Sequence, residues 1–447
     1  MIKEDVRMKK WAPRVLLAAA LAGLSAFLLK GDVWTFWTWW MLAFLMGMVA
    51  MPVTGRLFAG FEDKGWMFSK VLAITVTGFL TWFLVTAKIL PFTAATCIGV
   101  SIVCAVGCGV LYHFQGKNGI DCFPSGKVNL IYGEEILFFI FFLMWTYFAG
   151  FRPQAYGTEK FMDYGFMEAM MRSTTLPARD LWYSEGHINY YYGGQYFAVF
   201  LTKLSHTKVE LTYNLMRTFV AGLAFAMPFS LVYQMMSDRM KGLQKSEKVI
   251  KGLPFAAGFT AGTAVSIAGN MHYVIYAQII PLIEKLTGKE VSSYWFPDAT
   301  RYIGYNPYRE EDRTIHEFPC YSFVLGDLHA HVVNIMFVLL VIALLYVWLR
   351  GVRKKTVPVE TSMKYGKFWK EQLLMPHLLV ISVLLGMFQW TNFWDFVIYY
   401  VVTLGTVLFA NIIRFQGKIK KIMVVTFAQM AEIYLLAYLV ILAFPFS

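Results

Sequence analysis

Residues 316–332, HEFPCYSFVLGDLHAHV, lead directly into residues 331–350, an apolar run long enough to cross a bilayer. The stretch holds three histidines and two carboxylates, namely His316, Glu317, Asp327, His329 and His331. Ionisable side chains beside a spanning segment are costly in hydrocarbon and usually serve a function. The sequence therefore predicts a membrane protein whose functional residues gather where this segment enters the membrane.

The composition also indicates a membrane protein. Of the 447 residues, 58% are hydrophobic and only 15% are charged, whereas about a quarter are charged in soluble domains. The net charge of +12 comes from basic residues spread over short loops, so we expect contact with bilayer lipid and no nucleic-acid partner. Apolar runs of spanning length predict an all-α polytopic fold with about eleven transmembrane helices, near residues 12–29, 33–51, 68–89, 92–112, 130–150, 211–236, 253–271, 331–350, 374–390, 394–411 and 422–445.

The loop charges predict an orientation. By the positive-inside rule the N-terminus and alternate basic loops lie in the cytoplasm, provided that residues 188–204, INYYYGGQYFAVFLTKL, do not cross the membrane. We expect these residues to lie along the outer interface, where tyrosines are favoured. Two long segments, 151–210 and 272–330, then face outward. The predicted site is therefore extracellular, on a multi-pass protein of the cytoplasmic membrane.

The first four apolar runs carry almost no polar side chains. We expect residues 1–115 to form a separate four-helix transmembrane module, which could bind a partner membrane protein. Residues 116–447 would form the catalytic module with both outer segments. Glu134 and Glu135, at the start of the fifth run, are expected at the cytoplasmic interface rather than in the site.

The first outer segment contains two candidate catalytic acids, Glu159 and Asp163. On a helix their i, i+4 spacing places them on one face about 6 Å apart. There they could share a metal or divide acid and base roles. Alternatively they lie on the exposed face of an interfacial helix, with Lys160 neutralising them.

A polar and aromatic stretch follows in the same outer segment. Its candidate substrate-binding residues are Arg179, Asp180, Trp182, Asn189, Tyr190, Tyr191 and Tyr192. An arginine could pair with a phosphate, and aromatic faces could stack on sugar rings. The alternative is an ion pair between Arg179 and Asp180, with the tyrosines forming an interfacial belt.

The second outer segment contains a candidate site for Mg²⁺, Mn²⁺ or Zn²⁺, formed by Asp327, His329 and His331. If the segment is extended, His329 and His331 point the same way, whereas in a helix Asp327 and His331 do. Asp327 is also a candidate catalytic acid. Alternatively it caps the helix that follows.

Four further polar residues are candidate substrate ligands. Arg301 and Glu317 belong to the second outer segment, and Asn392 and Asp395 lie in a turn between two apolar runs. Asp395 stands just inside a span, so it should face a polar cavity or a partner.

Four motifs together resemble a known family. They are EKFMDY at 159–164, PARDLWYSEGHINYYYGG at 177–194, EFPCYSFVLGDLHAH at 317–331 and NFWD at 392–395. The combination resembles the YYY-motif membrane proteins of archaea and bacteria, the Chlor_Arch_YYY family, over about residues 130–447. Those proteins are in turn similar to GT-C glycosyltransferases. The resemblance implies a GT-C-like fold and an enzyme that moves a sugar from a polyprenyl-phosphate donor to an acceptor at the outer face.

The resemblance also implies roles for individual residues. An acid near Asp163 would be the general base, and a metal, Arg179 or Arg301 would stabilise the phosphate leaving group. Gln195 stands where this family often has histidine, so no role is assigned to it. Two other functions stay open from the residues, namely a membrane-embedded hydrolase using the metal candidates and a lipid or polysaccharide transporter.

Overall fold

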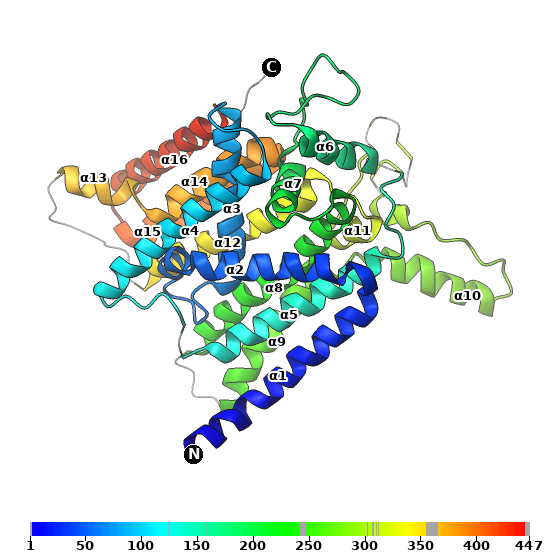
Figure 1. Ribbon diagram of the computed structural model, residues 1–447, viewed down its shortest axis with the longest axis horizontal. Helices are drawn as coiled ribbons and strands as arrows, with labels where there is room; N and C mark the ends of the chain where they lie inside the picture. Colours follow the sequence, from blue (N-terminus) through cyan, green and yellow to red (C-terminus); the bar gives the residue numbers. More distant parts are fainter. Residues whose placement is uncertain are drawn as a thin grey trace.

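The computed structural model describes residues 2–124, 126–157, 159–241, 247–301, 303–305, 308–309, 311, 313–354 and 365–442. These residues form a bundle of helices (Figure 1) without a β-strand, and two isolated bridges, Arg179–His187 and Tyr305–Tyr308, are their extended pairings. The prediction of an all-α polytopic membrane protein is confirmed.

Each of the eleven predicted runs overlaps one long helix. They are α1 (Ile2–Leu29), α2 (Val33–Leu57), α3 (Trp66–Thr86), α4 (Ala94–Lys117), α5 (Val128–Ala149), α8 (Val209–Met240), α9 (Glu247–Ser266), α12 (Ala330–Arg353), α14 (Pro376–Thr391), α15 (Phe393–Phe415) and α16 (Ile419–Ile441). Within the described ranges, 8 helical stretches are long and apolar enough to cross a membrane. One of them, Trp11–Leu57, includes both α1 and α2, between which the chain turns back at η1 (Lys30–Asp32) (Figure 1). The apolar helix α14 is shorter.

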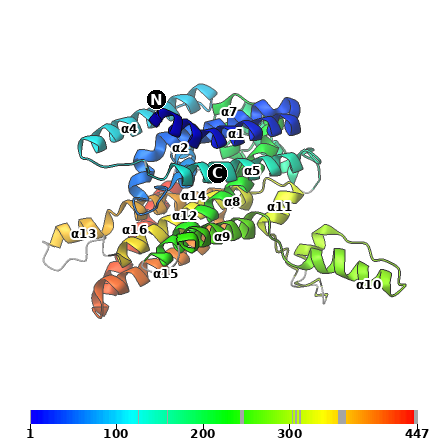
Figure 2. The same ribbon diagram turned by 90° about the horizontal axis from the view of Figure 1, so that it is seen from below.

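Shorter helices lie between the long ones. They are α6 (Lys160–Arg172), α7 (Gly193–Ser205), η2 (Val274–Ile279), α10 (Ile280–Leu286), η3 (Phe296–Thr300), α11 (Pro319–Leu325) and α13 (Tyr365–Leu373). Figure 2 shows α10 projecting away from the bundle.

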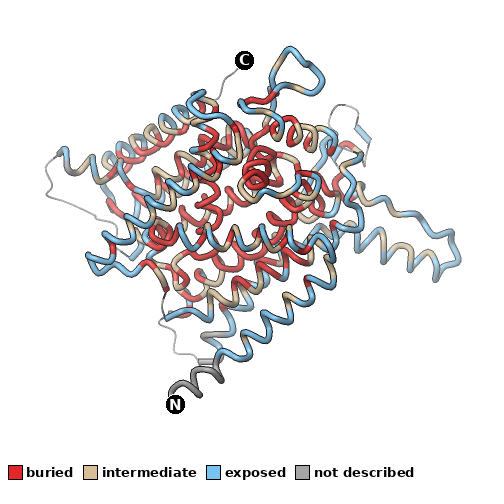
Figure 3. The backbone as a smooth tube through the Cα atoms, viewed as in Figure 1, coloured by how far each residue is buried: buried red, intermediate tan, exposed pale blue. Residues whose placement is uncertain are grey.

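The helix α7 lies inside the bundle. Its 13 residues span about 20 Å at 1.5 Å per residue, so it is too short to cross a hydrocarbon core of about 30 Å. The expectation that this segment does not cross is therefore supported. The expectation that it lies along the outer interface is wrong, because every residue from Gly193 to Lys203 is buried (Figure 3).

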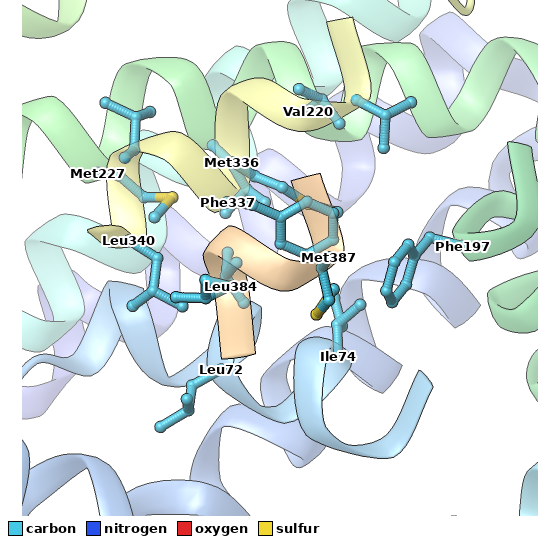
Figure 4. Close-up of a cluster of buried hydrophobic side chains, with 14 of the residues drawn as sticks. Leu72, Ile74, Phe197, Val220, Met227, Met336, Phe337, Leu340, Leu384 and Met387 are labelled. Carbon is cyan, nitrogen blue, oxygen red and sulfur yellow. The ribbon is translucent and has the colours of Figure 1, made fainter. Parts of the chain in front are cut away.

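The helices share one large apolar core. Figure 4 shows side chains from α3, α7, α8, α12 and α14 packed together, among them Leu72, Phe197, Met227, Phe337 and Leu384. Because α3 belongs to the predicted module 1–115, that module packs directly on the rest of the protein. Its existence as a separate unit stays a prediction.

Small residues set the spacing of α8 and α9. Gly258 and Gly262 stand four residues apart on α9, and a Cβ on either would lie 2.7 Å from a backbone carbonyl oxygen of α8. Such a small-xxx-small pattern lets two membrane helices approach closely. Dispersion contacts then stabilise the pair, because the hydrophobic effect does not act between helices in lipid. This pair supports α8, which carries one of the site residues described below.

The two ends of the bundle differ in their polar contacts. At one end, ion pairs join Glu62 to Lys127 at 2.7 Å and to Lys241 at 3.3 Å, and Arg350 binds Asp238. The helices α6, α7 and α11 lie at the other end, near the start of α12. The loop groups that were predicted to lie on opposite sides of the membrane thus lie at opposite ends. Which end faces the cytoplasm stays a prediction.

Candidate functional site

A buried carboxyl, Asp163, lies at the centre of the candidate site. The inner face of α6 consists of Asp163, Phe166, Met167 and Met170, a helical spacing that turns the acid into the core. Asp163 is 0% exposed. Its Oδ1 accepts a hydrogen bond of 2.7 Å from Gln195 Nε2, whereas Oδ2 has no hydrogen-bond partner among the described residues.

The environment of Asp163 favours its protonated form. Burial raises the pKa of Asp163 to about 8, the Gln195 hydrogen bond opposes this rise, and the nearby charges of Asp327 and Glu159 add to it. A carboxyl with such a pKa can exchange a proton near neutral pH.

The YYYGG sequence positions Gln195. A Cβ on Gly193 would lie 2.5 Å from the Trp390 ring, and one on Gly194 would lie 3.2 Å from Val333, so only glycine permits this approach. The first turn of α7 therefore packs tightly against α14 and α12. Gln195 follows in that turn, and its Nε2 also donates to Leu328 O at 3.0 Å.

The segment around Asp327 is shaped by two helix ends. Gly326, with φ of +92°, ends α11 in the left-handed region, where its N–H donates to Ser322 O. Asp327 follows and is 5% exposed. The residue that precedes the first turn of α12 is His329, and its side chain makes no capping bond. The N-cap position of α12 is thus occupied by His329 and not by Asp327.

Two cations, Lys160 and Arg217, lie beside these acids. They flank Gly326, because a Cβ placed there would be 2.9 Å from Arg217 Nη1 and 3.2 Å from Lys160 Nζ. Arg217 is held by Phe323 O at 2.8 Å and Asn214 Oδ1 at 2.7 Å. Burial and the Arg217 charge lower the pKa of Lys160, while the Asp327 charge opposes this. Both cations therefore act on Asp327, whose charge in turn acts on Asp163.

Two histidine–glutamate pairs form a more exposed layer of the site. His329 Nε2 lies 2.8 Å from Glu159 Oε2, and His331 Nε2 lies 3.1 Å from Glu317 Oε2. The two imidazole rings are 5.5 Å apart. Burial would raise the pKa of Glu317, but its hydrogen bond and charge interaction with His331 lower it. Residues 327–329 are not helical and His331 lies in the first turn of α12, so neither the extended nor the helical alternative describes the whole segment 327–331.

The predicted metal ligands Asp327, His329 and His331 do not form one ligand set. Among the residues that the structure describes, no three His, Cys, Asp or Glu side chains converge as ligands of one ion. The groups form pairs instead, and Asp327 faces Lys160 and Arg217. We therefore derive no chemical step through a metal, and the need for one stays a prediction.

The predicted substrate-binding residues of the first outer segment divide into two groups. Tyr190 is 40% exposed and stands 6.2 Å from the Phe166 ring on α6, so it borders the Asp163 group. The Tyr191 ring lies 4.9 Å from that of Tyr190, at an angle of 45°. Tyr192, in contrast, is buried and accepts a hydrogen bond from an indole of α3. Its role is packing.

The loop before the tyrosines lies at the surface. Arg179, Trp182 and Asn189 are exposed there. Asp180 Oδ1 accepts from the backbone N–H groups of Trp182 and Tyr183, so it shapes a turn. The described contacts include no ion pair between Arg179 and Asp180.

Arg301 is also held away from the Asp163 group. Its guanidinium donates to Pro297 O at 2.8 Å and lies 4.8 Å over the Trp295 ring. These two contacts are local to residues 295–301.

Asp395 has the polar partners that its position required. Its Oδ2 accepts from Asn392 at 2.8 Å and from the buried amide of Asn334 at 2.6 Å. Asn334 lies one turn after His331 on α12. The Asn392–Asp395 turn is thus joined to the candidate site through one helix, and the expectation of a partner for Asp395 is confirmed.

Comparison with known proteins gives the family. A family model described as an uncharacterized membrane protein (DUF2298) matches residues 76–447. The chain belongs to this family. The search of curated proteins and that of solved structures found no match. The DUF2298 match covers the whole candidate site and begins within α3, inside the predicted module 1–115. It names neither the YYY-motif family nor a glycosyltransferase.

Three site residues of this DUF2298 protein were missed from the sequence. Arg217 carried a usable signal, because it is the one charged residue in the apolar run 211–236. Lys160 was considered only as a neutralising neighbour, and Gln195 was given no role. A single sequence does not show that their side chains converge, since they come from α6, α7 and α8.

Proposed function

We propose that this DUF2298 protein is a membrane glycosyltransferase that moves a sugar from a polyprenyl-phosphate donor to an acceptor hydroxyl. The observation that carries the proposal is the buried Asp163 carboxyl, which interacts with the charge of Asp327, while the cations Lys160 and Arg217 act on that same Asp327. It supplies a proton acceptor and a place for an anionic leaving group in one site. The donor class comes from the resemblance to GT-C enzymes.

The proposed reaction is a single displacement. Asp163 Oδ2 takes the proton of the acceptor hydroxyl, whose oxygen forms a bond to the anomeric carbon. The bond from that carbon to the phosphate oxygen breaks, and its electron pair leaves with the polyprenyl phosphate. Gln195 holds Oδ1 at 2.7 Å, which leaves Oδ2 as the oxygen available for the proton.

In this proposal Lys160 and Arg217 stabilise the departing phosphate. They lie next to Gly326 and Asp327, whereas Arg179 is exposed in its loop and Arg301 is engaged with Pro297 O. Cations held in a protein site need little reorganisation when charge develops, which makes them effective in transition-state stabilisation.

The exposed fractions suggest a direction of approach. Asp163 is enclosed, whereas the side chains of Glu159, His331 and His329 are 57%, 38% and 22% exposed. We propose that the acceptor approaches over this layer, bordered by Tyr190, and that the polyprenyl chain stays in the bilayer. The positive-inside rule supports an outward orientation of this end of the bundle in the cytoplasmic membrane.

The test uses purified full-length protein and a radiolabelled polyprenyl-phosphate hexose, with and without EDTA. Label should move into an acceptor fraction in the wild type and stay in the donor in Asp163→Asn and Arg217→Met. Glu185→Gln, which removes an exposed carboxyl from the same outer segment, should transfer label normally. EDTA shows whether a metal is needed.

Three outcomes contradict the proposal. Transfer at the wild-type rate in both site variants would remove these residues from the chemistry. Release of the sugar to water alone would instead favour a hydrolase. Label that stays in the donor lipid under every condition would also overturn the transferase assignment.

A further inference from the structure

A helical arm, residues 271–295, projects away from the bundle (Figure 2). The arm consists of η2, α10 and a non-helical segment that returns to the bundle. Each of its residues is exposed or half-buried, and none is buried. The arm therefore gains little from packing on the rest of the chain, and its apolar side chains need another environment.

The helical part of the arm is amphipathic. Large apolar side chains recur there at positions i, i+4, i+7, i+8 and i+11, which share one face of a helix. All five are exposed, and they are Ile275, Ile279, Leu282, Ile283 and Leu286. The polar side chains of Gln278, Glu284 and Lys285 lie outside this apolar face. A contiguous exposed apolar face marks a site of contact with a membrane or another protein.

Contacts within the arm hold its two halves together. Glu284 Oε2 accepts from the backbone N–H of Ser292 at 2.8 Å and from its hydroxyl at 2.9 Å. The rings of Tyr273 and Tyr294 pack edge-on at 5.4 Å. The arm thus has a fixed shape of its own, in which the apolar face stays open.

The apolar surface of the arm continues that of α9. This helix packs closely on α8, a candidate membrane span, and exposes Phe255 and Phe259 at the surface of the bundle. Residues 252–283, from α9 into α10, contain no Lys, Arg, Asp or Glu. Such an uncharged stretch is typical of a segment that stays in contact with lipid. The first charged residue after it is Glu284, beyond most of the apolar face.

We infer that the arm is a membrane anchor whose apolar face lies in the interfacial layer of the bilayer. A helix with one apolar face binds there with its axis along the membrane surface. Tyr273, Tyr276 and Trp295, which are exposed at the base of the arm, are residue types favoured at the level of the lipid head groups.

The charges of the arm favour insertion over electrostatic attraction. Its ionised side chains balance in sign, with Glu284 and Glu290 against Lys285 and Lys289. The arm therefore offers no net charge to an oppositely charged protein or to anionic lipid. Burial of the apolar face is the term that remains, so the arm should bind a zwitterionic bilayer.

The experiment uses the purified full-length protein in phosphatidylcholine vesicles, with the photocrosslinking residue benzoylphenylalanine at single positions. Leu282 and Leu286 report on the apolar face, and Lys285 reports on the opposite side. Phe259 on α9 serves as the lipid-facing reference, and the exposed Glu185 serves as the water-facing one. After irradiation, the yield of lipid adducts at Leu282 and Leu286 should match that at Phe259 and exceed that at Glu185 and Lys285 several-fold.

Two matched variants test the role of the apolar face. Both are made with the crosslinking residue at position 286. Ile279→Glu places a carboxylate in the face, so it should lower the yield of lipid adducts several-fold. Gln278→Glu adds the same charge at the neighbouring position outside the face and should leave the yield unchanged. Gln278 donates to the Tyr273 hydroxyl at 3.2 Å, and a glutamate can accept from that hydroxyl instead.

Three results would overturn the inference. Adducts as rare at Leu282 and Leu286 as at Glu185 would mean that the arm lies in water. Crosslinks between two copies of the chain would assign the apolar face to a second copy. Equal adduct yields in Ile279→Glu and Gln278→Glu would mean that the face does not hold the arm in the bilayer. None of these results depends on glycosyl transfer, so this test and that of the proposed function fail separately.

Discussion

Replacing Asp163 by asparagine should remove a pH dependence of stability that the buried carboxyl creates. Asp163 has a pKa of about 8 in the folded protein, against 3.8 for the ordinary carboxyl. The unfolded chain therefore releases its proton first as the pH rises. The stabilisation of the wild type is complete below pH 4 and declines as the pH rises toward 8. Asparagine has the same shape as the protonated acid and does not titrate.

The magnitude follows from the two pKa values. Each pH unit between them changes the unfolding free energy by about 1.4 kcal/mol. Between pH 5 and pH 8 the wild type should thus lose roughly 4 kcal/mol relative to Asp163→Asn. At an unfolding entropy of about 2.1 cal/mol/K per residue, the 447 residues convert this to a difference in Tm of about 4 °C.

Thermal unfolding in detergent at several pH values tests this reasoning without any knowledge of the substrate. The two proteins should have similar Tm values at pH 5, and the variant should become the more stable one by pH 8. Glu185→Gln serves as the control for the loss of one carboxyl. Parallel curves for wild type and Asp163→Asn from pH 5 to pH 8 would refute the assignment of a buried, protonated acid.

Three further substitutions test the surroundings of the site. Gln195→Leu removes the hydrogen bond that favours ionised Asp163. The pH at which the unfolding free energy stops declining should therefore be higher in this variant than in the wild type. Gly326→Ala places a Cβ 2.9 Å from Arg217 at a φ of +92° and should cost about 1–3 kcal/mol in the unfolding free energy, seen as a lower Tm. Asp395→Ala leaves a buried amide of α12 without its acceptor and should cost about 1–3 kcal/mol, seen in the same assay.

A different result would contradict each of these three predictions. An unchanged pH profile in Gln195→Leu would mean that the amide does not stabilise the ionised acid. Full stability of Gly326→Ala would mean that α11 ends in some other conformation. Full stability of Asp395→Ala would mean that the α12 amide finds another acceptor or reaches water.

The sequence predicted the long helices because hydrophobic length is a strong local signal in membrane proteins. This signal did not predict the surroundings of residues 188–204. Loop charges predicted that this segment does not cross, but its burial depends on Gly193 and Gly194 meeting Trp390 and Val333. Those partners come from distant helices, and hydropathy alone contains no information about them. The tyrosines at the start of this segment were therefore interpreted as residues of the membrane interface, whereas the helix that follows them is buried in the protein core.

The candidate site was predictable to the extent that its residues are unusual for their surroundings. Asp327 was identified because an acid beside an apolar run is costly, and Asp163 was identified from its spacing to Glu159 and from the family resemblance. The same argument applies to Arg217 and was not followed there. The partners in the two histidine–glutamate pairs lie far apart in the chain, so their pairing needs the fold. The burial of Glu135 was not predicted, because its counter-ion, Lys70, comes from another helix.

The charges of the site suggest how acid and cations would act together in the proposed reaction. With Asp163 protonated, Asp327 balances one of the two cations, Lys160 and Arg217, so the buried group has an excess positive charge that suits an anionic donor. Asp163 must lose this proton before it can act as the base, and in its ionised form the negative charge that grows on the leaving phosphate raises its affinity for the acceptor proton. The acid thus becomes a stronger base at the stage when the acceptor hydroxyl must lose its proton. Removing Arg217 should therefore impair proton transfer as well as donor binding, which predicts a loss in kcat and not only a rise in KM.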